Sequence, residues 1–314
     1  MNMLNELRKI RYARFRLEMV AADRLKLPTY KGSTFRGAFG HAFKRLVCVK
    51  RDLDCSTCLI RDRCVYYYVF ETPFGGEGDP RGYRFAPHPF VIEPPEETRS
   101  MYELGTAFQV GLVLIGRALD YLPYFVYVFE EMGRRGLGAG RGKAVLRRII
   151  ALGSGAESCI YQADTGHLVS DYPVCVGPPD TEAMGTRLRL RLQTPLRLKT
   201  VGRYAREVDF ALLVRALLRR SRDLARFHCG VELDMDYRHW IARAAAVQAV
   251  SAQVRWYDWE RYSQRQERKT PLGGLVGEVE FAGEWKPFLP LLRLGADVHV
   301  GKGTGFGLGR YEIL

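Results

Sequence analysis

Four cysteines lie close together in the first quarter of the chain, and grouped thiols are ligands for a metal ion. Cys48, Cys55, Cys58 and Cys64 are separated by six, two and five residues, so the middle two form a CxxC pair. Four thiolates complete the tetrahedral shell that zinc prefers. An iron–sulfur cluster is the less favoured alternative, and a metal-free group of thiols is another. We expect a structural zinc at these four residues.

The compartment decides between metal ligation and disulfide bonds for these thiols. The chain contains no apolar run long enough to span a bilayer, and Glu6, Arg8 and Lys9 stand where a signal peptide would be apolar. We therefore expect a cytoplasmic protein without membrane association. In a reducing compartment, metal ligation is favoured over disulfides.

Glycines alternate with other residues at the end of the chain, beside two cations. Lys302 lies inside this run and Arg310 follows it. The five glycines are Gly301, Gly303, Gly305, Gly307 and Gly309. Such a backbone can turn its N–H groups toward an anion, and the flanking cations suit phosphate. A second glycine cluster at 133–143 adds Arg141 and Lys143. Neither cluster matches the GxxxxGK[ST] pattern of a nucleotide-hydrolysing P-loop.

The overall charge also favours a polymer with a phosphate backbone. The formal net charge is +13, which attracts polyanions, although a basic protein with a solvated surface is the alternative. Arg187, Arg189 and Arg191 alternate with leucines and share one face of an expected strand. We predict that these arginines contact phosphates; an ordinary solvated sheet face is the other interpretation.

Both halves of the chain show the same order of expected elements. The first half has strands at 12–20, 65–70, 85–92, 106–115 and 144–152, with helices at 33–47 and 117–132. The second has strands at 187–194, 251–259 and 275–281 and at the end of the chain, with helices at 209–227 and 284–294. Each half is approximately βαββαβ, so we predict an α+β fold of tandem ferredoxin-like (RRM-like) domains. The Pro- and Gly-containing stretch 176–185 separates domain 1–178, with its cysteine insertion at 48–64, from domain 186–314, with its glycine-rich loop at 301–309.

Several motifs resemble those of a known family. Residues 195–199, 256–266, 273–277 and 299–309 are similar to the C-terminal half of the CRISPR precursor-RNA-processing endoribonucleases of the RAMP superfamily. Residues 30–48 and the cysteine group running into 66–71 resemble the branch with an N-terminal four-cysteine insertion. The resemblance implies cleavage within CRISPR repeat RNA, without a metal or other catalytic cofactor. The substrate's own 2′-hydroxyl would attack the phosphate and leave a 2′,3′-cyclic phosphate and a 5′-hydroxyl.

The same resemblance implies partners and leaves alternatives open. Repeat RNA is the expected partner, other Cas proteins are further ones, and the protein would act in antiviral defence as a monomer or homodimer. The main alternative is a non-catalytic RAMP subunit that holds guide RNA inside an effector complex. A third alternative is an RNA-binding module that is stabilised by zinc and has no catalytic activity.

Cleavage by a 2′-hydroxyl needs a base, an acid and a cation at the phosphate. His41 is the best candidate for proton transfer, because an imidazole in solvent exchanges protons near neutral pH. In the helix expected at 33–47, the buried stripe would be Phe35, Phe39, Ala42 and Leu46. His41 and Lys44 would then face solvent, with Gly37 and Gly40 leaving room for a phosphate backbone on that side.

The family resemblance suggests companions for His41. It implies a Tyr, His and Lys set that maps onto Tyr30, His41 and Lys44, and Arg36 on the same helix joins the RNA-binding residues. His299, at the edge of the terminal glycine loop, is the main rival for the catalytic role. The alternative for His41 is an ordinary exposed histidine.

Overall fold

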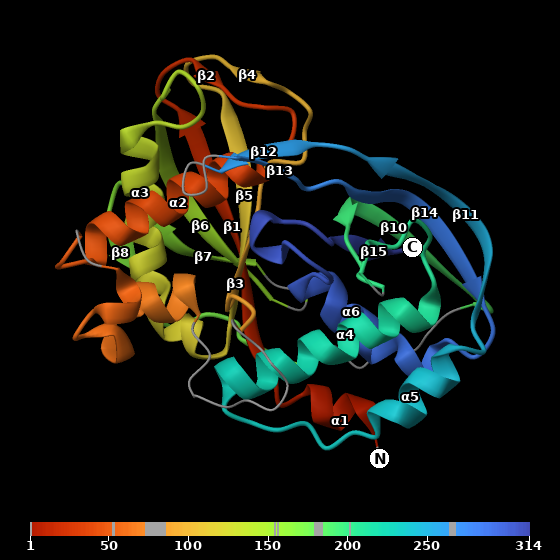
Figure 1. The fold of residues 1–314 in the computed structure, drawn as a ribbon. Helices are drawn as coiled ribbons and strands as arrows, with labels where there is room; N and C mark the ends of the chain where they lie inside the picture. The colour runs from red at the N-terminus through yellow and green to blue at the C-terminus, as the bar shows by residue number, and fades with distance from the viewer. Residues whose placement is uncertain are drawn as a thin grey trace. The chain divides into compact units, whose positions relative to one another are not determined.

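The computed structural model describes residues 2–51, 54–72, 86–153, 155, 157–178, 185–200, 202–263 and 268–314. It divides the chain into two compact units (Figure 1). The N-terminal unit comprises Tyr12–Val174 and Phe227–Cys229, and the C-terminal unit comprises Met1–Arg11, Cys175–Arg226 and Gly230–Leu314. The expected boundary at 176–185 lies where the C-terminal unit resumes. The assignment of residues 1–11 to the first domain is corrected, because they pack with the second.

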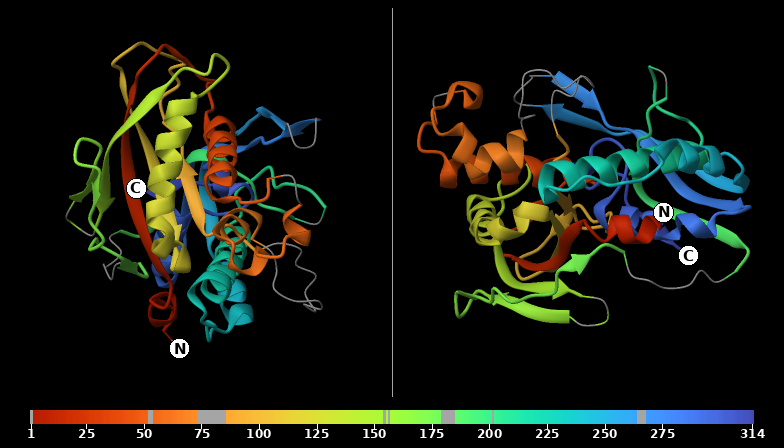
Figure 2. Two further views of the ribbon diagram at one scale, coloured as in Figure 1. Left: turned by 90° about the vertical axis from the view of Figure 1, so that its left-hand side faces the viewer. Right: turned by 90° about the horizontal axis from the view of Figure 1, so that it is seen from below.

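The N-terminal unit is built on an antiparallel sheet in the order β3-β5-β1-β6-β7-β8. Helices α2 (Gly32–Val47) and α3 (Leu122–Arg135) pack against each other on one face of it (Figure 2). Its strands are β1 (Arg11–Ala21), β3 (Phe90–Glu93), β5 (Ala107–Ile115), β6 (Ala144–Leu152), β7 (Glu157–Gln162) and β8 (His167–Leu168). Outside the sheet, β2 (Leu25–Lys26) pairs with β4 (Met101–Tyr102).

The C-terminal unit has a second antiparallel sheet, in the order β11-β14-β10-β15. Its strands are β10 (Arg187–Leu196), β11 (Gln248–Tyr257), β14 (Gly274–Ala282) and β15 (Tyr311–Ile313). Its helices are α1 (Met3–Leu7), α4 (Phe210–Leu224), α5 (Tyr237–Ala244) and α6 (Leu289–Val298). The unit also contains the short strand β9 (Cys175–Val176) and the hairpin of β12 (Glu260–Ser263) with β13 (Arg268–Pro271).

The two sheets follow one topology. The N-terminal unit runs β1-α2-β3-β5-α3-β6 and the C-terminal unit runs β10-α4-β11-β14-α6-β15. In both, the first and third strands lie at the centre, flanked by the fourth and second. This arrangement confirms the predicted tandem ferredoxin-like fold. Among the described helices, none has both the length and the apolar character needed to cross a membrane.

An aromatic cluster forms the core beneath α2. Phenylalanines recur every four residues on the helix, so Phe35, Phe39 and Phe43 form one fully buried stripe. The ring of Phe39 lies 5.3 Å from that of Phe90 and 5.3 Å from that of Phe125. The expectation that Leu46 belongs to this stripe is wrong: its side chain is 46% exposed, and Phe43 takes the buried position.

The strand expected at 65–70 is wrong as well. Residues 65 and 66 are helical and continue into a π-helical turn at Tyr67–Glu71. The rings of Tyr66 and Phe70 stack at 5.2 Å, and Tyr66 also packs on Phe43 at 5.9 Å. Valine and aromatic side chains favour strands on average, but here the four-residue spacing lets them cover α2.

Candidate active site and RNA interface

The start of α2 is anchored by a buried lysine. Lys31 is fully buried, and its Nζ donates hydrogen bonds to the carbonyl oxygens of Thr29 and Glu97. Burial lowers the pKa of Lys31, and the negative charge of Glu97 opposes that shift. The anchor fixes the backbone that carries Tyr30 into the helix.

His41 lies on the solvent side of α2, as expected. Its side chain is exposed and takes part in no hydrogen bond among the described residues. Gly37, one turn earlier on the same side, is open: an added Cβ would meet nothing within 4 Å. Helical side chains lean toward the preceding turn, so His41 stands over this bare stretch of backbone.

Gly40 does not share that open side, which corrects the expectation for it. An added Cβ would lie 2.2 Å from the ring of Phe70, so Gly40 is needed for close packing inside the unit. The free approach to the helix backbone is therefore at Gly37.

The structure brings together only part of the expected Tyr, His and Lys set. Lys44 is half-buried and lies one turn after His41 on the same side of α2. Tyr30 is half-buried and lies two residues before the helix, whose first residue, Gly32, is about 14 Å along the axis from His41 at a rise of about 1.5 Å per residue. His41 and Lys44 can meet one phosphate, whereas Tyr30 stands at the other end of the helix.

Arg36 is not a surface residue, and the prediction that it contacts RNA is corrected. Its side chain is 6% exposed, its guanidinium lies 3.5 Å from the centre of the Phe70 ring, and its Nη2 is 3.0 Å from His88 Nε2. The contacts with Phe70 and His88 hold this charge inside the unit.

The four clustered cysteines line one small cavity. Cys48 ends α2, and the other three lie on the short 3₁₀ turns Cys55–Thr57 and Arg61–Arg63 or at their ends. All four line a cavity of about 20 Å³. Burial and the neighbouring Glu71 raise the pKa of the Cys55 thiol, and Lys44 opposes that shift. Within the described part of the chain, no three His, Cys, Asp or Glu side chains are close enough to hold an ion. The number and kind of donors thus fit zinc, but their positions do not form a closed shell.

The terminal glycine loop is folded onto the end of β10 and the residue that follows it. Six backbone N–H groups bond to protein oxygens, namely those of Val300, Lys302, Phe306, Gly307, Gly309 and Arg310. Gly309 has φ +74° and an added Cβ would lie 1.8 Å from the Val300 carbonyl oxygen, so only glycine fits. Gly301 has φ +89° and approaches the Arg197 carbonyl oxygen in the same way. The predicted contacts of Gly301, Gly303, Gly305, Gly307 and Gly309 with RNA remain predictions, although much of this backbone is already bonded within the protein.

A cluster of cations stands at this loop. The pKa of Lys302 is lowered by burial and by the charges of Arg219 and Lys199, and the charge of Asp223 opposes this shift. Like charges held together in this way are a ready site for an anion, which would relieve their repulsion. Arg219, on the exposed side of α4, was not among the residues singled out in the sequence, although the helical period places it outside. Arg310 is half-buried beside β15.

Arg220, the neighbour of Arg219, points inward and holds the end of α6. Its Nε and Nη2 donate to the carbonyl oxygen of Val298 at 2.9 and 2.6 Å. Burial lowers the pKa of Arg220 to about 10, so it remains charged at neutral pH. The glycine loop begins directly after Val298, and the buried arginine therefore fixes where the loop starts.

Replacing Arg220 with methionine should destabilise the protein by about 1–3 kcal/mol, because the α6 carbonyl loses a charged donor inside the unit. Urea denaturation measures this. Arg219→Met is the matched control: it should change stability by no more than about 0.5 kcal/mol, since the side chain is exposed. Equal losses from the two changes would contradict the role assigned to Arg220.

The arginines of β10 face glutamates. Arg191 lies 2.9 Å from Glu278 and 3.5 Å from Glu312, and Arg187 lies 3.2 Å from Glu280. Arg189 is 3.9 Å from the same Glu280. This face is balanced in charge, as expected of a solvated sheet surface. Phosphate contact at Arg187, Arg189 and Arg191 stays a prediction without support from this geometry.

The first glycine cluster forms a tight turn between α3 and β6. An added Cβ on Gly138, at φ +71°, would lie 2.1 Å from the Lys26 carbonyl oxygen, so packing alone explains this glycine. Arg141 and Lys143 are exposed on the turn, Arg141 with φ +48°. Both positions are compatible with the phosphate contact predicted for them.

His299, the rival for the catalytic role, is fully buried. Its Nδ1 donates to the Leu308 carbonyl oxygen at 3.1 Å, and its backbone takes φ +60° at the end of α6. The residue joins the two ends of the glycine loop. A substrate would not reach it in this conformation.

Two family models match different parts of the chain. Residues 9–173 match a model described as an N-terminal domain, AF_1859_N. Residues 190–311 match the model of the CRISPR-associated endoribonuclease Cas6. An uncharacterized protein of Archaeoglobus fulgidus is 24% identical over 215 residues, which cover 66% of this chain and 70% of that protein.

Solved Cas6 structures share the fold. A Cas6 product complex is 17% identical, with a TM-score of 0.55 over 96% of this chain and 99% of that one. Thermus thermophilus Cas6 is 14% identical, with a TM-score of 0.54 over 97% and 99%. A chain of a Cas6-RT-Cas1–Cas2 complex is 13% identical, with a TM-score of 0.58 over 97% of this chain and 46% of that one.

These observations define an α+β protein of two ferredoxin-like units, the second of which ends in a folded glycine-rich loop. The chain belongs to the family with the AF_1859_N N-terminal domain and carries a Cas6 domain in its second half, so the expected relation to the CRISPR RNA-processing family is confirmed. Its place in a branch defined by the four cysteines stays a prediction.

Proposed function

We propose that this protein is an endoribonuclease that cuts CRISPR repeat RNA without a metal ion. The observation that carries the proposal is the exposed His41 beside the open Gly37, on the first long helix of a chain with a Cas6 domain. A histidine over bare backbone can reach an RNA phosphate that lies along the helix.

The proposed reaction uses the RNA's own nucleophile. The 2′-oxygen forms a bond to the adjacent phosphorus while the bond to the 5′-oxygen breaks, giving a 2′,3′-cyclic phosphate and a 5′-hydroxyl. A base takes the 2′-hydroxyl proton and an acid donates one to the 5′-oxygen. His41 serves as one of these groups, and the nearby Lys44 supplies a positive charge for the phosphate. Tyr30, at the far end of α2, would contact a different nucleotide.

The C-terminal unit would bind the RNA backbone through its cation cluster. The charges of Arg219 and Lys199 repel that of Lys302, Asp223 offsets this in part, and a bound phosphate would remove the remaining repulsion. The glycine loop presents Lys302 to solvent because its own backbone is bonded to the Pro195–Arg197 segment.

Lys302→Ala should weaken binding to repeat RNA and flatten its dependence on salt. One lost phosphate contact lowers the slope of log K against log salt by about 0.7–0.9. Fluorescence anisotropy at several salt concentrations measures this slope. Lys286→Ala, another exposed lysine of the same unit, is the matched control and should leave the slope unchanged. An unaltered slope in Lys302→Ala would mean that the loop serves only for packing.

The cysteine group would hold a structural zinc, with an iron–sulfur cluster as the less favoured occupant. The supporting observations are four thiols around one cavity and the positive Lys44 beside Cys55, which offsets the charge of thiolate ligands. Binding would draw the two 3₁₀ turns toward Cys48. No step of the reaction passes through this metal.

The function is tested with repeat RNA from the same genome, incubated with the protein in EDTA. Cleavage should persist, the products should end in a 2′,3′-cyclic phosphate and a 5′-hydroxyl, and a 2′-deoxy nucleotide at the cut site should abolish the reaction. Tight binding without any cleavage would instead support the non-catalytic RNA-holding subunit. A requirement for added metal would overturn the proposed mechanism.

A further inference from the structure

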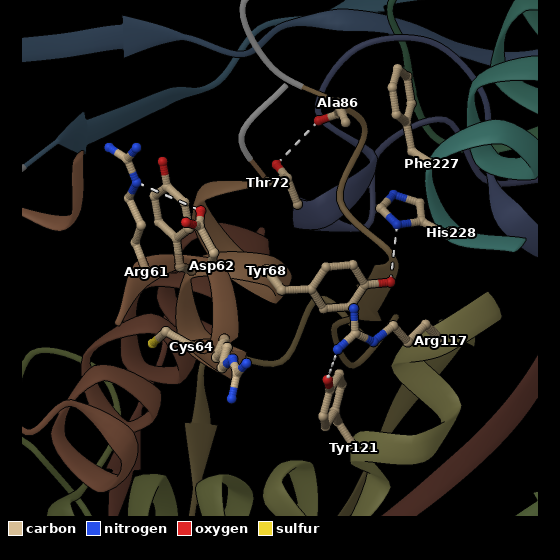
Figure 3. Close-up of a pocket in the computed structure, with 12 residues that line it drawn as sticks. Arg61, Asp62, Cys64, Tyr68, Thr72, Ala86, Arg117, Tyr121, Phe227 and His228 are labelled. Atoms are coloured by element: carbon tan, nitrogen blue, oxygen red, sulfur yellow. Dashed lines mark hydrogen bonds and ion pairs between the residues drawn. The ribbon is translucent and has the colours of Figure 1, made fainter. Parts of the chain in front are cut away.

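One cavity of the N-terminal unit is lined by no residue of α2, the helix that carries His41. Its volume is about 260 Å³ and its lining comes from three segments, 61–72, 117–121 and 227–228, with Ala86 (Figure 3). Ligand pockets usually have volumes of about 300 Å³ or more. This slightly smaller cavity suits part of a polymer, such as one base or one phosphate.

The floor of this pocket is a fixed chain of hydrogen bonds. The Nε2 of His228 lies 2.6 Å from the Pro87 carbonyl oxygen, which can only accept, so Nε2 carries the proton. Nδ1 then accepts from the Tyr68 hydroxyl at 3.1 Å (Figure 3). Burial raises the pKa of Tyr68 far above its ordinary value, so the hydroxyl keeps its proton. These polar groups satisfy one another, which leaves the Tyr68 ring as the surface offered to a ligand.

The segment that carries His228 packs closely against Gly116. An added Cβ on Gly116, at φ +57°, would lie 2.0 Å from the His228 carbonyl oxygen. Only glycine permits this approach, so the pocket floor is built into the fold.

Two guanidinium groups line the pocket without a carboxylate partner among the described residues. Arg117 lies over the rings of Tyr68 and Tyr121, at 5.2 and 5.7 Å, and donates to the Tyr121 hydroxyl at 2.8 Å. Arg63 is exposed and forms no ion pair in the described structure. Arg61, by contrast, pairs with Asp62 at 3.6 Å. An arginine held in place by tyrosine rings and a hydroxyl group is oriented in advance for a phosphate.

Exposed aromatic rings continue from the pocket along α3. The rings of Tyr121 and Tyr124 are 6.1 Å apart, and the side chains of Tyr124 and Tyr127 are 44% and 64% exposed. Exposed rings beside oriented arginines are typical of surfaces that bind single-stranded nucleic acid, because bases stack on the rings and phosphates pair with the cations.

We propose that this nucleotide pocket, formed chiefly by Arg63, Tyr67, Tyr68, Arg117 and Tyr121, binds one phosphate and its unstacked base in a single-stranded segment of RNA. The inference rests on the proposed function for the identity of the polyanion. It assigns the N-terminal unit a binding site in addition to the His41 side of α2, and Tyr124 and Tyr127 would carry the next bases.

The test uses the full chain and a fluorescent decamer of uridine, which contains no repeat and needs no cleavage. Arg117→Gln and Arg63→Gln should each weaken binding by about 5–10-fold, within the usual effect of one stacking or phosphate contact. Arg147→Gln is the control: this exposed arginine of β6 lies 3.7 Å from Asp164 and should change affinity less than about 2-fold. Arg63→Gln keeps the test valid if loss of Arg117 disturbs the fold, since Arg63 is exposed.

Unchanged affinity in both variants, or an equal loss in Arg147→Gln, would overturn the proposal. So would unchanged RNA affinity together with lost association with another Cas protein, because the pocket would then serve a protein partner. Cleavage and decamer binding are measured separately. A wild-type protein that cuts no repeat but binds the decamer through Arg63 and Arg117 would refute the proposed activity and leave the pocket standing.

Discussion

Replacing His41 with alanine should slow cleavage of repeat RNA by about 10²–10⁴-fold, the usual contribution of a positioned proton-transfer group. The affinity for RNA should barely change, because one imidazole adds little beside many cationic phosphate contacts. Single-turnover cleavage of labelled repeat RNA gives the rate, and anisotropy with an uncleavable 2′-deoxy substrate gives the affinity.

His167→Ala is the matched control for this prediction. His167 is an exposed histidine at the start of β8 in the same unit, so its loss should leave the cleavage rate unchanged. A wild-type rate in His41→Ala would move the proton transfer to another group, such as Lys44. His299 could take over proton transfer only after a rearrangement of the loop that buries it.

Removal of the metal proposed at Cys48, Cys55, Cys58 and Cys64 should destabilise the N-terminal unit strongly. The free energy of binding at a structural zinc site is about 10–16 kcal/mol, and it contributes directly to folding. Protein purified without chelator should contain about one zinc per chain. Cys58→Ser should lose most of it and lower the Tm by about 10 °C, as a loss of several kcal/mol would in a domain of this size.

Cys159→Ser is the control for the metal prediction, because Cys159 is an exposed thiol on β7 outside the cavity. It should change neither the zinc content nor the Tm. Wild-type protein with four free thiols, no metal and an unchanged Tm after chelation would reject the site. If the purified protein contained iron and absorbed visible light, the site would hold an iron–sulfur cluster and not zinc.

The fold was largely predictable because its strands and helices have clear periods. In β10, leucines alternate with arginines, and only one face of the sheet can be buried, so the strand and its register follow from the sequence. The prediction of a strand at 65–70 failed because the valine and aromatic residues there suit a strand, while the packing of Tyr66 and Phe70 on α2 requires a helix.

The site was predictable only where exposure follows from the helical period alone. His41 lies outside because its neighbours on α2 fill the core. Arg36 and Gly40 were misplaced because Phe70, which covers both, lies about thirty residues further along and leaves no periodic signal in α2. The nucleotide pocket was not foreseen for the same reason, since His228 reaches it from 160 residues beyond Tyr68.

The C-terminal unit contains both ends of the described chain. Helix α1 contacts α6, and the Glu6 carboxylate accepts a hydrogen bond from the backbone N–H of Asp234 at 2.7 Å. During synthesis, α1 leaves the ribosome well before α6 (Leu289–Val298) and must wait for it before the two helices can pack. The N-terminal unit can therefore finish folding while the other is still incomplete. For the same reason, a fragment of residues 186–314 would lack α1, a helix of its own unit. A circular permutant in which residues 1–11 are joined to this fragment would isolate the C-terminal unit better.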